Sequence, residues 1–442
     1  MKKVLFLLVL TISFFTFSND WEFGSEGEHL IPLESSNAEI KSEKIIMKKT
    51  KDGMSVSVRF VFVNPVQEVK QIGFITPSEK MEEEEYRELG ITNFETKVNG
   101  VKVDSNIKRF DKSSFKTAAI LKGENRNDYI YYFKAPFKAG ENVVEHSYTY
   151  EGSSGIKGAD YAYVITTISK WKNKNVGDFE LIIDMGENAF FALPYSFWKD
   201  NRKIDWEIIG DGKIESIFGK SAVSSDESDD KTFVKIKNGY VRFKTQKFSP
   251  DRDIFIEVES IDNVFSVGFL PEKNTKYVYK DNLTKIYSSI TANCELYKLS
   301  DKDIKILRNY PFAKLGYDFS NQELKSYFSK FFWYSPMYKT VELDTWDNDI
   351  VSLISGVEES RELTKKYLRE DLKKYSAVEL KRMKNLPYAL RGYEFKDKDL
   401  EGYYKNKYSW YGKFDCYDSE DGGEALTKDE QELIRKINMI LK

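Results

Sequence analysis

The chain has 442 residues, of which 41% are hydrophobic and 31% charged, and this length and composition predict two to four domains with cores to bury. Its formal net charge of −3 argues against a nucleic-acid partner, because nucleic-acid binders need a basic face. The two histidines, His29 and His146, are too few for a metal site built from a histidine cluster.

Residues 1–18 have the pattern of a secretory signal peptide. Lys2 and Lys3 precede an apolar run at 4–17 that is too short to span a bilayer of about 30 Å, and the small Ser18 precedes two polar residues. A buried N-terminal strand or helix is the alternative. We expect an extracytoplasmic protein (periplasmic, cell-surface or secreted), with no transmembrane segment once the signal is cleaved.

Residues 19–265 read as an antiparallel β-sandwich region, because short β-branched and aromatic runs alternate with turn residues. Asp52-Gly53 and Asn99-Gly100 predict tight hairpins. Two subdomains with a break near 150–158 would also fit the length. We expect an acidic helix at 78–89, a loop at 219–231 and a linker at 266–299. Strands are predicted at 40–47, 54–62, 94–98, 101–103, 129–133, 143–150, 179–184, 233–236, 240–243 and 254–259.

The start of this region resembles an uncharacterised family of exported bacterial β-domain proteins. The residues that carry the resemblance lie at 39–45, 56–64 and 73–77. The resemblance covers about the first third of the chain. It implies no activity, since none is assigned to that family.

The C-terminal part contains an internal repeat. Residues 307–319 and 383–395 share Asn, Pro, an aromatic residue, Ala, Gly, Tyr and Phe in the same order. Further matches are Leu324, Tyr327, Phe328 and Trp333-Tyr334 with Leu400, Tyr403, Tyr404 and Trp410-Tyr411, with one residue inserted before the second Trp. We expect two small, mainly helical repeats at 300–354 and 376–442, joined by a helical bridge at 355–375. The whole chain is therefore predicted to be an α+β multidomain protein.

Helix-start signals support this helical prediction. Four segments have the form of a capping box, in which a hydroxyl binds the backbone N–H three residues on, and Asp397 should cap a further helix. Proline disfavours helix at the residue before it, so Pro311 and Pro387 should end helices. Further helices are expected at 345–354 and 427–441. The four capping segments begin at Ser300, Ser320, Ser376 and Thr427.

The repeats look like YARHG domains, which are small modules of exported bacterial proteins named after a Tyr-Ala-Arg-His-Gly turn. The first copy has Phe-Ala-Lys-Leu-Gly at 312–316, and the second has Tyr-Ala-Leu-Arg-Gly at 388–392. The Arg-His pair is absent from both copies, so no role of that His carries over. The resemblance implies binding at the cell envelope and no established chemistry.

The repeated residues allow a structural and a functional interpretation. In the structural one, small residues and prolines shape the turn and aromatic rings fill the core. These residues are Pro311, Ala313, Gly316, Phe319, Pro387, Ala389, Gly392 and Phe395. In the functional one, rings present their faces to a ligand. The candidates are Tyr317, Trp333, Tyr334, Tyr393, Trp410 and Tyr411. Cys294 and Cys416 could form one disulfide or remain two free thiols.

Catalytic motifs are missing from the sequence, which has no nucleophile elbow, zinc-protease motif, P-loop or dinucleotide fingerprint. We therefore expect a non-catalytic cell-envelope binding or interaction protein without cofactor or metal. Its partners would be cell-wall glycan, peptide or an envelope protein. The alternatives are a secreted hydrolase for cell-wall sugar or peptide, with a carboxylate pair in the β half, and a structural envelope component.

Overall fold

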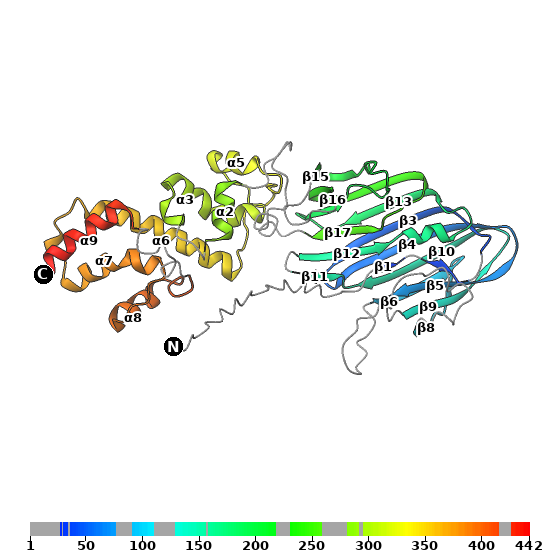
Figure 1. The fold of residues 1–442 in the computed structure, drawn as a ribbon, viewed down its shortest axis with the longest axis horizontal. Coiled ribbons are helices and arrows are strands. Elements are labelled where there is room, and N and C mark those ends of the chain that lie inside the picture. The colour runs from blue at the N-terminus through cyan, green and yellow to red at the C-terminus, as the bar shows by residue number, and fades with distance from the viewer. Residues whose placement is uncertain are drawn as a thin grey trace, which may run out of the picture.

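The computed structural model describes residues 27–28, 30–33, 36–76, 91–109, 129–155, 158–217, 230–258, 281–290, 295–414 and 426–442. The signal peptide expected at 1–18, the acidic helix expected at 78–89, most of the loop expected at 219–231 and both cysteines lie outside these residues. Figure 1 shows a β-rich part, residues 27–258, followed by a helical part, residues 281–442. The α+β multidomain prediction is confirmed. Within the described residues, no helix has the length and apolar character needed to cross a membrane.

The β part is built from two sheets. A large sheet of 13 described strands runs in the order β1-β12-β17-β14-β16-β13-β3-β4-β10-β6-β7, with β11 on β12 and β15 on β16, and a small one has the order β2-β5-β9-β8. The bounds are β1 Gly27–Glu28, β2 Ile31–Pro32, β3 Glu39–Thr50, β4 Gly53–Asn64, β5 Glu68–Thr76, β6 Ile91–Val98, β7 Val101–Val103, β8 Asn106–Arg109, β9 Tyr129–Phe137, β10 Gly140–Tyr150, β11 Ser153–Gly155, β12 Gly158–Val164, β13 Val176–Asp184, β14 Phe190–Pro194, β15 Glu207–Ile217, β16 Lys231–Phe248 and β17 Ile254–Val258.

Alternating burial explains why the strands pair as they do. Along β3, Ile45 and Met47 face the core while Ile46 and Lys48 do not, and Ile45 pairs with the buried Val58 of β4. The two-residue turn between these strands and the Asn99-Gly100 turn between β6 and β7 confirm both predicted hairpins. Asn99 and Gly100 both have positive φ, as a tight hairpin turn of this kind requires.

The small sheet packs on the large one through aromatic side chains. Phe74 of β5 lies with its ring centroid 4.9 Å from that of Tyr148 and 5.1 Å from that of His146, both on β10. Phe94 of β6 completes the contact at 5.5 Å. These rings are part of one hydrophobic core shared by both sheets, which gives the β part its two-layer form.

The structure departs from the expected strands in three ways. The strands predicted at 233–236 and 240–243 are one long strand, β16. The strands that were not predicted are β1, β2, β5, β8, β11, β12, β14 and β15. The pairs β3–β13 and β1–β12 are parallel, because the long connections between these strands allow a crossover. On either side of the break considered near 150–158, β10 and β12 belong to the same large sheet.

The helical part contains α2 Asn282–Ser288, η3 Glu295–Lys298, α3 Asp301–Arg308, α4 Tyr310–Lys314, α5 Gln322–Ser329, α6 Thr345–Tyr367, η4 Leu372–Lys374, α7 Ala377–Leu390, α8 Lys398–Lys407 and α9 Lys428–Ile440. The helices α2 and η3 lie in the segment expected to be a linker. The helix α6 is continuous across the repeat boundary that the sequence suggested at 354. It therefore runs without interruption from the first repeat into the bridge expected at 355–375, as Figure 1 shows.

Capping residues set most of the helix starts. Ser300, Ser376, Asp397 and Thr427 each accept a backbone hydrogen bond as predicted. The prediction for Ser320 is wrong by one residue, because the Asn321 side chain accepts from Glu323 N and Leu324 N instead.

The two repeat prolines behave differently. Pro311 stands in the first turn of α4, where its missing N–H costs no helix hydrogen bond. Pro387 lies inside α7, which continues to Leu390. The prediction that Pro387 ends a helix is therefore wrong. The carbonyl of Pro387 accepts a hydrogen bond from Arg391 at 2.7 Å, which ties this last turn together.

The first repeat is fixed to the edge of the β part. The Lys213 Nζ of β15 donates to the Tyr334 carbonyl at 2.8 Å and lies 3.4 Å from the carbonyls of Phe331 and Phe332. Asn188 Nδ2 donates to the Leu315 carbonyl at 3.3 Å. Phe190 of β14 belongs to the same hydrophobic cluster as the helices. The turn of the first repeat therefore rests directly on the sheet.

Candidate functional site

The two predicted turns have the same backbone geometry. Gly316 has φ +80° and Gly392 has φ +90°, a region that a residue with a Cβ rarely adopts. Gly316 N donates to Ala313 O at 2.9 Å, and Gly392 N donates to Ala389 O at 3.1 Å. Both glycines therefore close the same turn at the end of the preceding helix.

The tyrosines that follow the two turns, Tyr317 and Tyr393, make equivalent hydrogen bonds. Tyr317 N donates to Phe312 O at 3.0 Å, and Tyr393 N donates to Tyr388 O at 3.1 Å. The carbonyl of each of these tyrosines accepts a hydrogen bond from the Tyr that follows the repeat tryptophan. The Tyr334 hydroxyl donates to the Tyr317 carbonyl at 2.9 Å, and the Tyr411 hydroxyl donates to the Tyr393 carbonyl at 3.3 Å.

The aromatic rings repeat their packing as well. Phe319 stacks on Phe328 with centroids 5.3 Å apart, and Phe395 stacks on Tyr404 at 5.4 Å. The Trp333–Tyr334 and Trp410–Tyr411 centroid distances are both 6.4 Å. A Trp, a Tyr and a Phe thus close each small core over the glycine turn.

Half of the six residues predicted to form a ring-face ligand site lie in the core. Trp333, Tyr334 and Trp410 are buried, so they present no ring face to a ligand, and the functional interpretation is wrong for these three. Tyr317, Tyr393 and Tyr411 are half-buried, and their ligand role stays a prediction. A single aromatic stripe across both repeats is not formed by these six residues.

This shared geometry agrees with the family comparison. The YARHG domain family matches residues 280–359 and 357–441. The C-terminal part of the chain consists of two YARHG domains. The first domain thus includes α2 and η3, and the matches overlap within α6, so this helix ends one YARHG domain and begins the next.

Comparisons with other proteins add little to this. None of the curated proteins is similar in sequence to the chain. Among solved structures, a Legionella pneumophila protein described as a nutrient-binding candidate aligns with 77% of this chain and 100% of its own, at 17% identity and a TM-score of 0.47. At that TM-score the likeness supports no conclusion about fold or function.

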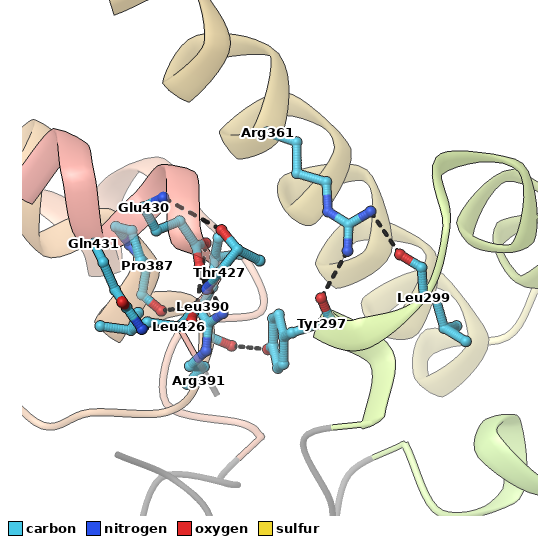
Figure 2. Close-up of polar contacts among 10 residues, drawn as sticks. All are labelled: Tyr297, Leu299, Arg361, Pro387, Leu390, Arg391, Leu426, Thr427, Glu430 and Gln431. Carbon is cyan, nitrogen blue, oxygen red and sulfur yellow. Dashed lines mark hydrogen bonds and ion pairs between the residues drawn. The ribbon is translucent and has the colours of Figure 1, made fainter. Parts of the chain in front are cut away.

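A buried ion pair replaces the family's Arg-His pair in the second YARHG domain. Arg391 Nη2 lies 2.9 Å from Glu430 Oε2, and their side chains are 1% and 6% exposed. The Arg391 guanidinium also lies over the ring of Tyr297, 4.2 Å from its centroid. Figure 2 shows Tyr297 donating its hydroxyl to the Leu390 carbonyl. Because Tyr297 belongs to η3 of the first domain, this network joins the two YARHG domains.

A second set of contacts reinforces the same junction. Arg361 of α6 donates to the Tyr297 carbonyl at 2.7 Å and to the Leu299 carbonyl at 2.8 Å (Figure 2). Burial raises the pKa of the Tyr297 hydroxyl, so it remains a neutral donor. Arg391 and Arg361 thus have structural roles at the junction.

A cavity of about 310 Å³ lies in the second YARHG domain, between the second half of α6 and helices α7, α8 and α9. Its walls carry five tyrosines, two cations and several apolar side chains. The lining residues are Ser360, Leu363, Thr364, Tyr367, Tyr375, Glu379, Arg382, Met383, Leu386, Tyr403, Tyr404, Lys407, Tyr408 and Leu433. We call it the tyrosine cavity. Its volume is at the lower end of the range for small-molecule sites.

The two cations of the tyrosine cavity both lie near the ring of Tyr403. The Arg382 guanidinium lies 4.1 Å from the centroid of the Tyr403 ring, and Lys407 Nζ lies 5.7 Å from it and 5.0 Å from that of Tyr408. Burial lowers the pKa of Lys407, but hydrogen bonding with Tyr408 and Tyr403 outweighs it, so the net shift is upward. Lys407 is therefore a full positive charge at physiological pH.

The cavity exists because the second domain lacks the large rings of the first. In the first domain Tyr287 of α2 stacks on Tyr310 with centroids 4.8 Å apart. With the same spacing that relates Ser300 to Ser376, Tyr287 corresponds to Leu363 of α6, which lines the cavity. In the repeat alignment Tyr310 corresponds to Leu386. Two ring positions are thus held by smaller side chains that line the cavity.

Sequence reasoning missed this site. Tyr403 and Tyr404 were recognised as repeat residues, but the cations and Tyr367, Tyr375 and Tyr408 were not predicted to act together. The available signal was the change from Tyr310 to Leu386 between otherwise matched repeats. In the part of the chain that the structure describes, no group of three or more His, Cys, Asp or Glu side chains could hold a metal ion.

Proposed function

We propose that the protein is a non-catalytic binding protein of the cell envelope, and that the tyrosine cavity of its second YARHG domain holds the ligand. The observation that carries this proposal is the cavity itself: aromatic faces, an apolar floor and two cations converge in one hollow. Tyrosine supplies contact area and a hydroxyl with few side-chain torsions to fix, which suits reversible binding.

The envelope location is part of the same proposal. It is supported by the signal-peptide pattern at residues 1–18 and by the YARHG domains at 280–441. Cell fractionation with antibody detection, together with the intact mass of the recovered protein, tests it. Recovery of the uncleaved chain from the cytoplasm would overturn this part.

A pull-down tests the binding role. The full mature chain is mixed with purified peptidoglycan and, separately, with surface polysaccharide. In a second sample Thr364→Tyr places a large ring at a buried position of the cavity lining. We expect wild type to bind one preparation and Thr364→Tyr to lose most of that binding.

The matched control is Asn406→Tyr, which adds the same side chain at an exposed position of α8, outside the cavity lining. It should bind like wild type. If wild type binds neither preparation, the binding role is wrong. If Thr364→Tyr binds as well as wild type and Asn406→Tyr, the ligand does not use the tyrosine cavity.

A further inference from the structure

The first YARHG domain contains an internal carboxylate at a Tyr–Lys pair. Asp281 Oδ2 accepts a hydrogen bond from the Tyr327 hydroxyl and lies 3.1 Å from Lys330 Nζ. Lys330 Nζ also lies over the Tyr327 ring, 3.8 Å from its centroid. The carboxylate of Asp281 is thus held by a phenol hydroxyl and an ammonium together, an arrangement of charge-assisted hydrogen bonds.

The second YARHG domain repeats the Tyr–Lys pair. Tyr403 and Lys407 correspond to Tyr327 and Lys330, since each lysine directly precedes the aromatic stretch that leads to the repeat tryptophan. The packing agrees: Phe331 stacks on Trp333 with centroids 5.1 Å apart, and Tyr408 stacks on Trp410 at 4.8 Å.

The carboxylate is not repeated. With the spacing that relates Ser300 to Ser376, Asp281 corresponds to Val357, which has no carboxylate, and the neighbouring Glu358 forms an ion pair with Arg308 of the first domain. The acid of the cavity lining, Glu379, accepts hydrogen bonds from the Ser376 backbone N–H and hydroxyl, both at 2.8 Å. Glu359 of α6 is exposed. Among the described residues, neither Arg382 nor Lys407 forms an ion pair with a carboxylate within 4.0 Å.

From this difference between the repeats we propose that the tyrosine cavity binds its ligand through a carboxylate group. The ligand carboxylate takes the place that Asp281 has in the first domain, held by the Tyr403 hydroxyl and Lys407, with Arg382 as a second cation. The rest of the ligand lies on tyrosine rings and on Met383 and Leu433 at the apolar floor. This inference rests on the proposed function and adds the chemical group of the ligand that the cavity recognises.

The cavity volume limits the size of the bound group. About 310 Å³ suits a unit of amino-acid or monosaccharide size rather than a long polymer segment. Such a carboxylate can come from a peptide C-terminus or from an acidic sugar. The two sources share the chemistry that the cations recognise, and matched probes separate them.

Titration calorimetry on the full mature chain tests the inference. The peptide pair is N-acetyl-dialanine and its C-terminal amide, and the sugar pair is glucuronic acid and glucose, all at millimolar concentration. We expect one of the acids to bind and its neutral partner to bind at least about tenfold more weakly, because hydrogen bonds to a charged group contribute about 1.5–3 kcal/mol each and tenfold represents about 1.4 kcal/mol. Equal binding of acid and neutral partner, or no binding by either acid, overturns the inference.

Two variants with the same charge change localise the binding. Lys407→Met should weaken binding of the acid about tenfold or more, whereas Lys330→Met, which changes the equivalent lysine of the first domain, should leave it unchanged. Tyr403→Phe removes one hydroxyl and should weaken binding by a smaller factor. Circular dichroism and thermal unfolding confirm that the variants fold. Lys407→Met binding like wild type would overturn the proposal.

The pull-down separates this inference from the proposed function. The preparation that binds is tested again after its carboxylates have been converted to methyl esters. Loss of binding supports the carboxylate inference. Unchanged binding that Thr364→Tyr still abolishes leaves the proposed function standing and overturns the inference.

Discussion

Arg391 and Glu430 form a buried ion pair that joins the glycine turn of the second YARHG domain to the start of α9, with a distance of 2.9 Å between Nη2 and Oε2. Removing one partner leaves the other charge buried without compensation. We expect Arg391→Met and Glu430→Gln each to lower the free energy of unfolding by about 3–5 kcal/mol, measured by denaturant titration. The double variant Arg391→Met/Glu430→Leu should lose less than the sum of the single changes. Additive losses would contradict a direct pair.

The glycine turns give a second prediction. Gly316→Ala and Gly392→Ala should each destabilise the protein by about 1–2 kcal/mol, because Ala is strained at positive φ. Asn, which tolerates this conformation better, should cost less at both positions. Gly402→Ala in α8 is the control: a Cβ there meets no atom within 4 Å, and Ala should stabilise the helix by about 1 kcal/mol. Thermal unfolding of the five variants decides between strain and a general intolerance of substitution.

Lys235 predicts a pH dependence in the β part. Burial, and then the nearby charge of Lys213, lower the pKa of Lys235 to about 7, and its Nζ donates to the Asn188 carbonyl at 2.7 Å. The unfolded chain keeps the ordinary pKa near 10.5, so between pH 7 and 10.5 it binds more protons than the folded protein, and stability rises with pH in this window.

The measurable outcome is a difference between two pH values. From pH 7 to pH 9, wild type should gain about 2 kcal/mol of stability relative to Lys235→Met, followed by tryptophan fluorescence in denaturant. Lys231→Met, which changes a lysine of the same strand, serves as the control and should track wild type. An equal change for wild type and Lys235→Met would show that Lys235 is charged in the folded state throughout.

Asp281 gives a second pH dependence, in which stability also rises with pH but in the acid range. Burial by itself would raise the pKa of Asp281, but the hydrogen bonds from Tyr327 and Thr284 and the contact with Lys330 outweigh it and lower the pKa. The stabilisation is therefore present above the unfolded value of 3.8 and is lost as pH falls through the lower, folded pKa. Asp281→Asn keeps a capping side chain and should cost about 1–2 kcal/mol at pH 7. This cost should shrink below pH 3; a cost independent of pH would mean that the charge is not involved.

Local signals explain which features could be predicted. The two turns were found because Gly316 and Gly392 stand in the same short pattern, where one residue decides the backbone conformation. The caps at Ser376 and Thr427 were found because a hydroxyl and an acid three residues apart satisfy each other. The hairpin at Asn99-Gly100 has the same kind of short-range cause.

Features that depend on long-range packing could not be predicted. Tyr297 contacts Leu390 across 93 residues, and Arg391 pairs with Glu430 across 39, so no local pattern connects them. Pro387 remains helical because the turn around it is held by contacts from the rest of the domain, which override local preference. The tyrosine cavity depends on the small side chain of Thr364 facing α7 and α8, which requires the fold to be known.

The continuity of α6 has a mechanical consequence for the pair of YARHG domains. A loop would let the two domains change their relative orientation freely. The 23 residues of α6, at about 1.5 Å each, instead form one rigid helix of about 35 Å that is shared by both domains. Pulling on a molecule held in the second module would thus load the first one, and through Lys213 the edge of the sheet, without an elastic joint to absorb the strain.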